Sequence, residues 1–293
     1  MASNPNTGTA SQFDFKQREF LFTEKDFNTL RLLGGKHAGI NLTEAKRELV
    51  YGRLTRRLRE LGLKRFDQYC ELLQSGDEEE IEIFTNAITT NLTSFFREAH
   101  HFDFLKELVP AWLKSEKSKD RRNFRVWCAG CSTGEEPYTI AMTVMEALAS
   151  QRAIKLRILA TDLDSKVLQT AARGVYDSER IENIEKSRLK KWFMMGTGAN
   201  QGMVKVMPKL QAAIRFKQHN MVHQAPPKGS TFDVVFCRNV VIYFDKETQI
   251  KVFNGFADCL AQDGHLFVGH CESLFQKSDR FKLVSQSTYQ RCR

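Results

Sequence analysis

The stretch VWCAGCSTGEEPYT, residues 126–139, indicates the fold of this 293-residue chain more clearly than any other segment. An apolar run leads into a loop of small residues, and Pro137 then falls in the first turn of an expected helix, where proline is well tolerated. A strand, a small-residue loop and a helix in this order let a ligand approach the backbone at the carboxyl end of a parallel sheet. The segment lacks both the G-x-G-x-x-G spacing of nicotinamide-binding folds and the lysine of a P-loop. Glu135 and Glu136 would repel a phosphate, so we expect a ligand with a cationic or sugar hydroxyl group.

Four short apolar runs rich in β-forming residues follow residue 119 and extend this pattern. They are FRVWCA (124–129), LRILAT (156–161), FDVVFC (232–237) and HLFVGH (265–270). Stretches long enough for a helix separate the first run from the second and the third from the fourth. This alternation predicts an α/β fold with a doubly wound, mostly parallel sheet.

A different pattern lies between Lys191 and Lys217. MVKVM alternates in polarity, GTGANQG (196–202) is typical of a turn, and IRFK (214–217) is expected to be a returning strand. We therefore expect a small antiparallel β-subdomain inserted at about residues 192–217.

Polar side chains follow two of the predicted strands. Asp162 ends the second strand in ATDLD (160–164), where a doubly wound fold places the acid that binds ribose hydroxyls. Asp164 fits better as the N-cap of the next helix. Arg238 and Asn239 end the third strand and should face the same crevice, although Asn239 could instead cap.

The part of the chain before the α/β pattern is helical and basic. We expect a disordered tail at 1–22, a helical domain at 23–90, a linker and helix at 91–119, and the α/β domain at 120–293. Asn41 followed by Glu44 predicts a capping box that opens a helix over 43–61. The net charge is +9, and residues 23–66 carry 11 Lys and Arg against 5 Asp and Glu. Such a patch suits an acidic partner, whether nucleic acid, anionic membrane or acidic protein.

Several classes of protein are disfavoured by composition. No run approaches 18 apolar residues, and the polar N-terminus does not resemble a secretory signal. Seven scattered cysteines predict reduced thiols in a cytoplasm and no disulfide framework. Cys128 and Cys131 form a C-x-x-C without a second ligand pair, so we expect no metal site.

The segment TTNLTSFFREAHHF (89–102) completes a set of four motifs. With STGEEPYT, ATDLD and FCRNVVIYF it closely resembles, in the same order, the chemotaxis receptor glutamate O-methyltransferases, the CheR family. The resemblance covers nearly the whole chain after residue 22. It implies a class I S-adenosylmethionine methyltransferase fold with an all-α N-terminal domain and a small β-subdomain. It also implies methyl transfer from S-adenosylmethionine to receptor glutamates, giving methyl esters and S-adenosylhomocysteine for sensory adaptation.

The resemblance further implies which residues form the site. The cofactor would be bound by Asn91, Thr93, Arg97, Glu136, Asp162, Asn220, Met221, Arg238 and Asn239. Arg97 and Tyr243 would lie nearest the transferred methyl group and are the expected catalytic residues. Without the resemblance, the polar residues of 89–102 would be interpreted as caps and a surface arginine.

The resemblance also implies the partners. Arg53, Arg56 and Arg59 on the basic helix would meet the acidic methylation helices of receptor cytoplasmic domains. Some members dock a receptor C-terminal peptide on the β-subdomain, and Gly196, Gly198 and Gly202 suit that role. Met195 stands where we expect a basic residue in such members. The enzyme would be a cytoplasmic monomer, recruited to receptor arrays and not inserted in the membrane.

The proposed chemistry needs no general base, because a glutamate with a pKa of about 4.3 is already ionised at neutral pH. Two rival functions stay open on the residues alone. A nucleic-acid methyltransferase is permitted by the net charge, but base methylation usually uses an Asn-Pro-Pro-Tyr motif, and Arg-Asn-Val-Val stands here. A non-catalytic S-adenosylmethionine-binding module would not require these polar strand ends.

Overall fold

The computed structural model describes residues 18–115, 122–149, 151, 153–227, 231–274 and 277–292. No helix in this part of the chain is long and apolar enough to cross a membrane. The expected disordered tail lies mostly outside these residues. Its last part is ordered, because Phe20 and Phe22 are buried against Phe66 in the helical domain.

Four helices form the N-terminal domain: α1 (Glu24–Ala38), α2 (Arg47–Glu60), α3 (Phe66–Gln74) and α4 (Glu78–Ile88). Val50, Leu54 and Leu58 recur at helical spacing on α2 and are fully buried in the domain core. The capping box expected at Asn41 is wrong. A short 3₁₀ turn, η1 (Glu44–Lys46), precedes α2, and the Asn41 backbone N–H donates to the carbonyl of Tyr243 instead.

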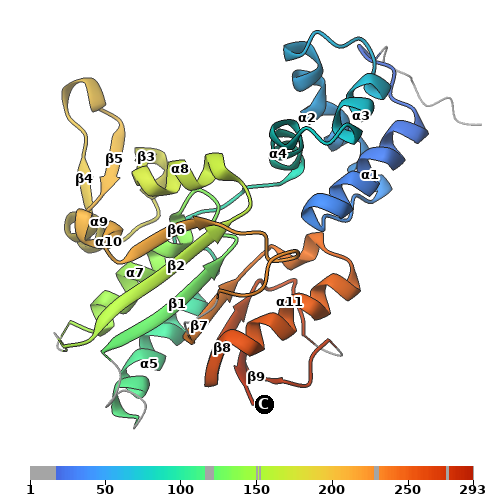
Figure 1. Ribbon diagram of the computed structural model, residues 1–293. Helices are drawn as coiled ribbons and strands as arrows, with labels where there is room; N and C mark the ends of the chain where they lie inside the picture. The colour runs from blue at the N-terminus through green and yellow to red at the C-terminus, as the bar shows by residue number, and fades with distance from the viewer. Residues whose placement is uncertain are drawn as a thin grey trace, which may run out of the picture.

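The main sheet has seven strands in the order β6-β2-β1-β7-β8-β10-β9 (Figure 1). Their bounds are β1 (Asn123–Ala129), β2 (Lys155–Asp162), β6 (Ile214–Gln218), β7 (Phe232–Cys237), β8 (Leu260–Val268), β9 (Phe281–Ser285) and β10 (Thr288–Arg291). Strands β6, β2, β1, β7 and β8 run parallel, and β10 pairs antiparallel with both β8 and β9. The strand order reverses at β1, which confirms the doubly wound α/β class.

Helices cover both faces of this sheet. On β1, Val126 and Cys128 pack into the core shared with α5 (His100–Lys114) and α7 (Glu135–Ala147). The alternate residues Trp127 and Ala129 pack on the other face with α11 (Lys246–Cys259). A central strand covered on both faces is mostly apolar, which is why FRVWCA has only Arg125 as a polar residue and shows no polar alternation. Helix α8 (Ser165–Arg173) follows β2 and packs beside β6.

The β-subdomain differs from its expected limits. It is a three-stranded antiparallel sheet in the order β3-β5-β4, from β3 (Val175–Asp177), β4 (Phe193–Met195) and β5 (Met203–Val206). The short helices α9 (Lys186–Trp192) and α10 (Pro208–Gln211) flank it. The segment IRFK is not its returning strand. It forms β6, which pairs parallel with β2, because alternating short strands cannot by themselves reveal which sheet they join.

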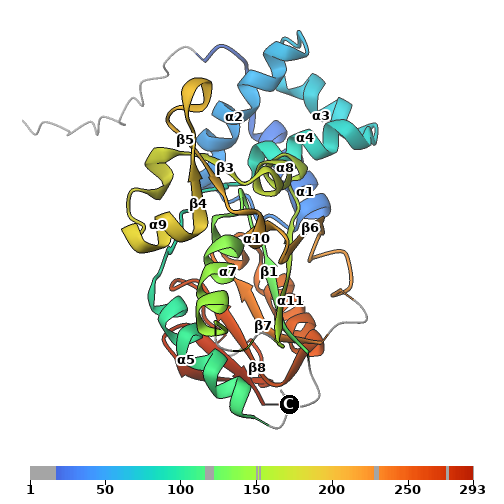
Figure 2. The same cartoon turned by 90° about the vertical axis from the view of Figure 1, so that its left-hand side faces the viewer.

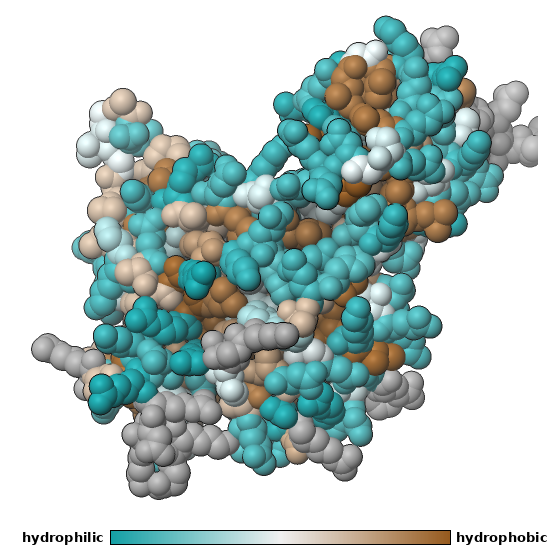
Figure 3. Space-filling model, viewed as in Figure 1, coloured by the Kyte–Doolittle hydropathy of each residue, from teal (hydrophilic) through white to brown (hydrophobic). Residues whose placement is uncertain are grey.

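The two smaller units lie on either side of a hollow. In Figure 1 the helical domain (blue) and the β-subdomain (yellow) stand apart, and Figure 2 shows both above the main sheet. The surface is hollowed between them (Figure 3). The segment from Thr89 to Ala99 links the helical domain to α5 without helix or strand.

Candidate active site

A cavity lies at the carboxyl ends of the central strands, where the strand order reverses. This is the usual ligand position in doubly wound folds. Its empty volume, including the open mouth, is about 980 Å³. The helical domain closes one side with Ala38 and Ile40. The structure brings all ten expected cofactor-binding and catalytic residues into its wall: Asn91, Thr93, Arg97, Glu136, Asp162, Asn220, Met221, Arg238, Asn239 and Tyr243.

The loop after β1 is shaped so that a ligand can approach its backbone. Gly130 has a φ of +82°, and a Cβ there would lie 2.4 Å from the Val240 side chain, so only glycine fits. Ser132 also has a positive φ, of 48°, and its N–H donates to Asp162 Oδ2 at 2.8 Å. The loop is therefore tied to the end of β2.

Asp162, the expected ribose ligand, lies in the cavity wall at the end of β2. Its Oδ1 accepts the Asp164 N–H at 3.1 Å, so each oxygen holds one backbone donor and keeps acceptor capacity toward the cavity. Burial raises its pKa, and the two N–H bonds oppose that rise. Asp164 is the N-cap of α8, accepting from Lys166 and Val167, so the alternative for Asp164 is confirmed.

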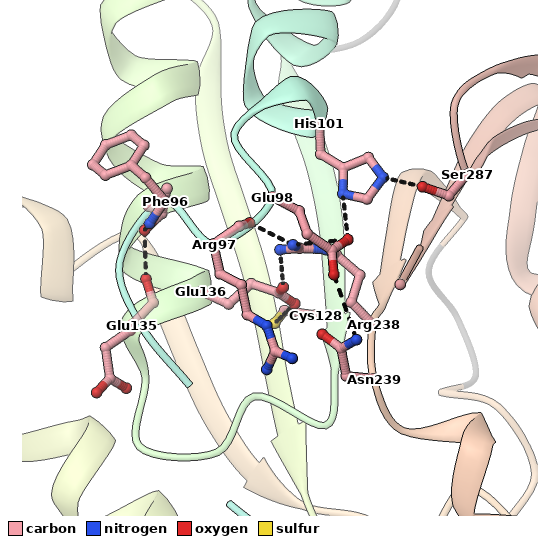
Figure 4. A network of polar contacts seen from close by, with 12 residues as sticks. Phe96, Arg97, Glu98, His101, Cys128, Glu135, Glu136, Arg238, Asn239 and Ser287 are labelled. Carbon is pink, nitrogen blue, oxygen red and sulfur yellow. Dashed lines mark hydrogen bonds and ion pairs between the residues drawn. The ribbon is translucent and has the colours of Figure 1, made fainter. Parts of the chain in front are cut away.

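A buried charge network supports the floor of the cavity (Figure 4). Arg238 is only 6% exposed and donates to Glu136 Oε2 at 2.6 Å, while its second terminal nitrogen lies 3.3 Å from Glu98 Oε2. That nitrogen also donates to the Arg97 carbonyl. The other Glu136 oxygen accepts from the Cys128 thiol at 3.2 Å. The charge of Arg238 is thus compensated within the protein. Its contacts with Glu98 and the Arg97 carbonyl on one side, and with Glu136 on the other, join the linker to α7.

The linker crosses the cavity and presents Arg97. The Arg97 guanidinium donates to the Leu92 carbonyl at 2.9 Å, and within the described chain no carboxylate forms an ion pair with it. Asn91 instead donates to Asp164 Oδ2 at 3.0 Å, and the Thr93 carbonyl accepts from Arg180. Arg97 is therefore a cation in the cavity wall that is available to a carboxylate.

Tyr243 and the segment after β6 also line the cavity. The ammonium of Lys46 lies 4.6 Å from the Tyr243 ring centroid, so the helical domain contacts this wall directly. Met221 adds an apolar surface. Asn220 bonds to the protein through both polar atoms: Nδ2 donates to the His37 carbonyl, and Oδ1 accepts from Val222. Its side chain shapes the turn.

Glu272 is a residue that the sequence did not reveal. Its buried carboxylate accepts four backbone N–H groups, from Asn239 (2.8 Å), Val240 (2.9 Å), Ile242 (3.2 Å) and Gly269 (2.6 Å). Three of these donors belong to the loop that carries Tyr243, and Asn239 in it has a φ of +57°. No local motif marks a carboxylate that accepts from three backbone groups 30 to 33 residues away.

The contacts of His101 fit a structural role. It is fully buried, its Nε2 lies 2.9 Å from Ser287 Oγ, and its Nδ1 faces Glu98 Oε2 at 3.7 Å. Burial, with the charge of Arg238, lowers its pKa to about 3. Burial also opposes ionisation of Glu98, but the His270 hydrogen bond and the Arg238 charge outweigh it and lower the Glu98 pKa to about 2.

Comparison with known proteins identifies the family to which this chain belongs. The description "CheR methyltransferase, SAM binding domain" matches residues 91–290, and "CheR methyltransferase, all-alpha domain" matches residues 25–89. This chain belongs to the CheR methyltransferase family. A chemotaxis protein methyltransferase of Pseudomonas aeruginosa is 40% identical over 94% of this chain and 96% of its own. The chemotaxis protein methyltransferase of Escherichia coli is 38% identical over 99% of this chain and 98% of its own length. That of Borreliella burgdorferi is 36% identical over 92% of this chain and 95% of its own length.

The CheR family's cofactor, S-adenosylmethionine, fits the residues present. The close glycine loop, the open acceptor capacity of Asp162 and the apolar Met221 wall suit a nucleoside.

The arginines expected to face a receptor do not form one uniform surface. Arg56 is exposed and pairs with Glu60 at 3.1 Å, and Arg59 pairs with Glu19. Arg53 instead bonds to the end of α4 and the linker, donating to the Ala87 and Thr89 carbonyls and to Thr90 Oγ1. Because Thr89 and Thr90 line the cavity, Arg53 also supports the cavity wall.

The three glycines of GTGANQG have local roles in the β4–β5 turn. Gly198 and Gly202 have φ values of +58° and +84°, and a Cβ at Gly196 would lie 2.0 Å from the Asn200 carbonyl oxygen. They shape the hairpin, whose Met195 is exposed.

Proposed function

We propose that this CheR-family enzyme methylates glutamate side-chain carboxylates of chemotaxis receptors, forming methyl esters. The observation that carries the proposal is Arg97, which has no carboxylate ion-pair partner among the described residues and lines the same cavity as Tyr243 and residues of the helical domain. A guanidinium in that position can orient a carboxylate. The alternative nucleic-acid methyltransferase is not favoured, because the family match spans both domains.

When bound, S-adenosylmethionine supplies a methyl group on a sulfonium. We assign Asp162 to the ribose hydroxyls, Glu136 to the cationic end of the cofactor, and Met221 to the apolar wall. Arg97 would orient the acceptor carboxylate or the carboxylate of the cofactor. Tyr243 would place its ring or hydroxyl beside the methyl group, where attraction between a cation and an aromatic ring is on the order of 1 kcal/mol. The acceptor arrives ionised, so positioning supplies most of the rate.

We assign receptor recognition to the exposed side of α2, with Arg56 and Arg59 as the rim that attracts acidic receptor helices. Arg53 would contribute by holding the linker. The β4–β5 hairpin is our candidate for a receptor C-terminal peptide, although Met195 gives it no charge there. Such substrates would place the enzyme in the cytoplasm, at receptor arrays.

The test uses methyl-labelled S-adenosylmethionine with receptor-containing membranes. Label should enter the receptor and be released as volatile methanol by mild base, because glutamate methyl esters are base-labile. Arg97→Ala should abolish the label, and the exposed Arg31→Ala should not. Base-stable label, or label in added RNA or DNA, would contradict the proposal.

A further inference from the structure

An exposed thiol, an imidazole and a partly buried carboxylate form a chain of contacts beside the active site. Cys271 Sγ lies 3.1 Å from His270 Nε2, and His270 Nδ1 lies 3.1 Å from Glu98 Oε1. A nucleophile, a base and an acid that orients the base are the three parts of an activated nucleophile. None of the functions assigned above uses Cys271 or His270.

The turn that carries this pair is held at both ends. Gly269 and Glu272 are buried, the Glu272 N–H donates to the Gly269 carbonyl at 2.8 Å, and the Glu272 carboxylate accepts the Gly269 N–H. His270 and Cys271 project to solvent between them. Fixed ends keep thiol and imidazole adjacent while reagents retain access.

Glu98 is suited to the role of orienting acid. It stays ionised at neutral pH, since its pKa is about 2. A proton moving from the Cys271 thiol to His270 Nε2 would leave an imidazolium whose Nδ1–H faces this anion. Thiolate next to a protonated imidazole is the arrangement that makes cysteines reactive.

The other cysteines provide a contrast within the same chain. Cys70, Cys128, Cys131, Cys237 and Cys259 are buried, and burial raises the pKa of each thiol. Cys292 is exposed like Cys271, but its sulfur contacts the Asp279 carbonyl at 3.7 Å and no imidazole. Cys292 is therefore a matched internal control.

We propose that Cys271 is an activated thiol, a modification site for hydroperoxides, and that its oxidation weakens cofactor binding. The thiolate attacks one peroxide oxygen, forming an S–O bond as the O–O bond breaks. The departing hydroxide takes the proton from His270, giving a sulfenic acid and water. The connection to the cavity runs through Glu98, which contacts Arg238 at 3.3 Å and Asn239 at 3.5 Å. Both of these residues line the cavity.

The first experiment measures thiol alkylation by iodoacetamide at pH 7, residue by residue, by mass spectrometry. Cys271 should react at least about tenfold faster than Cys292. His270→Gln, at an exposed position, should bring the two rates together. Equal rates in the wild type, or fast labelling that survives His270→Gln, would overturn the activated thiol.

The second experiment measures S-adenosylmethionine affinity by calorimetry after hydrogen peroxide treatment. The dissociation constant of the wild type should rise about 2- to 10-fold, which is the effect of losing one hydrogen bond. The dissociation constant of Cys271→Ser should not change on the same treatment. An unchanged affinity of the oxidised wild type would overturn the connection to the cavity. The alkylation experiment does not rest on the proposed function. If untreated wild type and Cys271→Ser both fail to methylate receptors, the proposed function fails and the thiol chemistry stands.

Discussion

Single side chains in the cavity wall differ in how much of their bonding capacity the protein already uses. Arg97 and Asp162 keep capacity toward the cavity, whereas Asn220 is bonded through both polar atoms and Arg238 is held between two acids. A residue type and its position can indicate that a side chain lies in a site. They cannot show whether its hydrogen bonds are already made within the protein.

At Asp162, substitution tests cofactor binding directly. Asp162→Ala should remove a charge-assisted hydrogen bond to the ribose worth about 1.5–3 kcal/mol, raising the dissociation constant roughly 10- to 150-fold. Isothermal titration with S-adenosylmethionine measures it, with the exposed Asp177→Ala on β3 as control. An unchanged affinity would remove Asp162 from the site.

At Glu272, the isosteric change Glu272→Gln should misplace the loop that carries Tyr243. An amide nitrogen would face backbone donors, and a buried donor left unsatisfied costs about 1–3 kcal/mol. We expect single-turnover methyl transfer at saturating cofactor to slow at least about fivefold. Glu272→Asp should recover part of the rate. The control Glu247→Gln, at an exposed position on α11, should leave the rate unchanged. A variant that loses melting temperature but keeps its transfer rate would show that Glu272 only stabilises the fold.

Elements were predictable from sequence where one pattern has one physical meaning. The apolar runs at 124–129 and 232–237 were predicted to be strands, and they form β1 and β7, which are buried on both faces. The short run at 214–217 was misassigned, because its pairing with β2 depends on contacts far away in the chain. The start of α2 was misplaced because Asn41 is engaged by Tyr243 across the domain boundary.

The division of labour along α2 leads to a prediction at the element scale. Reversing Arg56 and Arg59 to Glu should leave cofactor affinity unchanged and lower methylation of receptor membranes, while wild-type activity should fall as salt rises. Arg31→Glu on α1 is the matched charge reversal. Arg53→Glu should in addition weaken cofactor binding, because Arg53 holds the linker. Normal methylation by the double variant would mean that this face is only solvated.

Across the whole molecule, the junction of α5 with the β9–β10 hairpin should set acid stability. His101 is neutral when folded, with a pKa of about 3, but takes up a proton below about pH 6.5 when unfolded. Between about pH 6.5 and pH 3, only the unfolded state takes up this proton. The free energy of unfolding therefore falls as the pH falls, by about 1.4 kcal/mol per pH unit. In His101→Gln, the free energy of unfolding measured by urea titration should depend less steeply on pH between about pH 6.5 and 5. The Gln side chain keeps a polar group near Ser287. An identical slope would place the acid sensitivity elsewhere.

The pH dependence of methyl transfer tests whether the assembled active site works by positioning alone. Cofactor wall, linker and helical domain meet at Arg97 and Tyr243, and the acceptor glutamate needs no proton removed. The single-turnover rate at saturating cofactor should therefore stay level from pH 9 down to 5.5, since the acceptor protonates only near pH 4–5. Arg97→Ala should be severe at every pH. Arg97→Lys should recover only part of the rate, because a point charge cannot replace a bidentate guanidinium.

Tyr243→Phe separates the ring from the hydroxyl in the same assay. The loss should be small if the ring acts on the methyl group and severe if the hydroxyl does. Because we expect His101 to make the fold acid-sensitive, circular dichroism at each pH must show that the protein is still folded. A steep loss of rate below pH 7 in folded wild type would mean that a general base takes part, and His219 in the cavity wall would be the first residue to substitute.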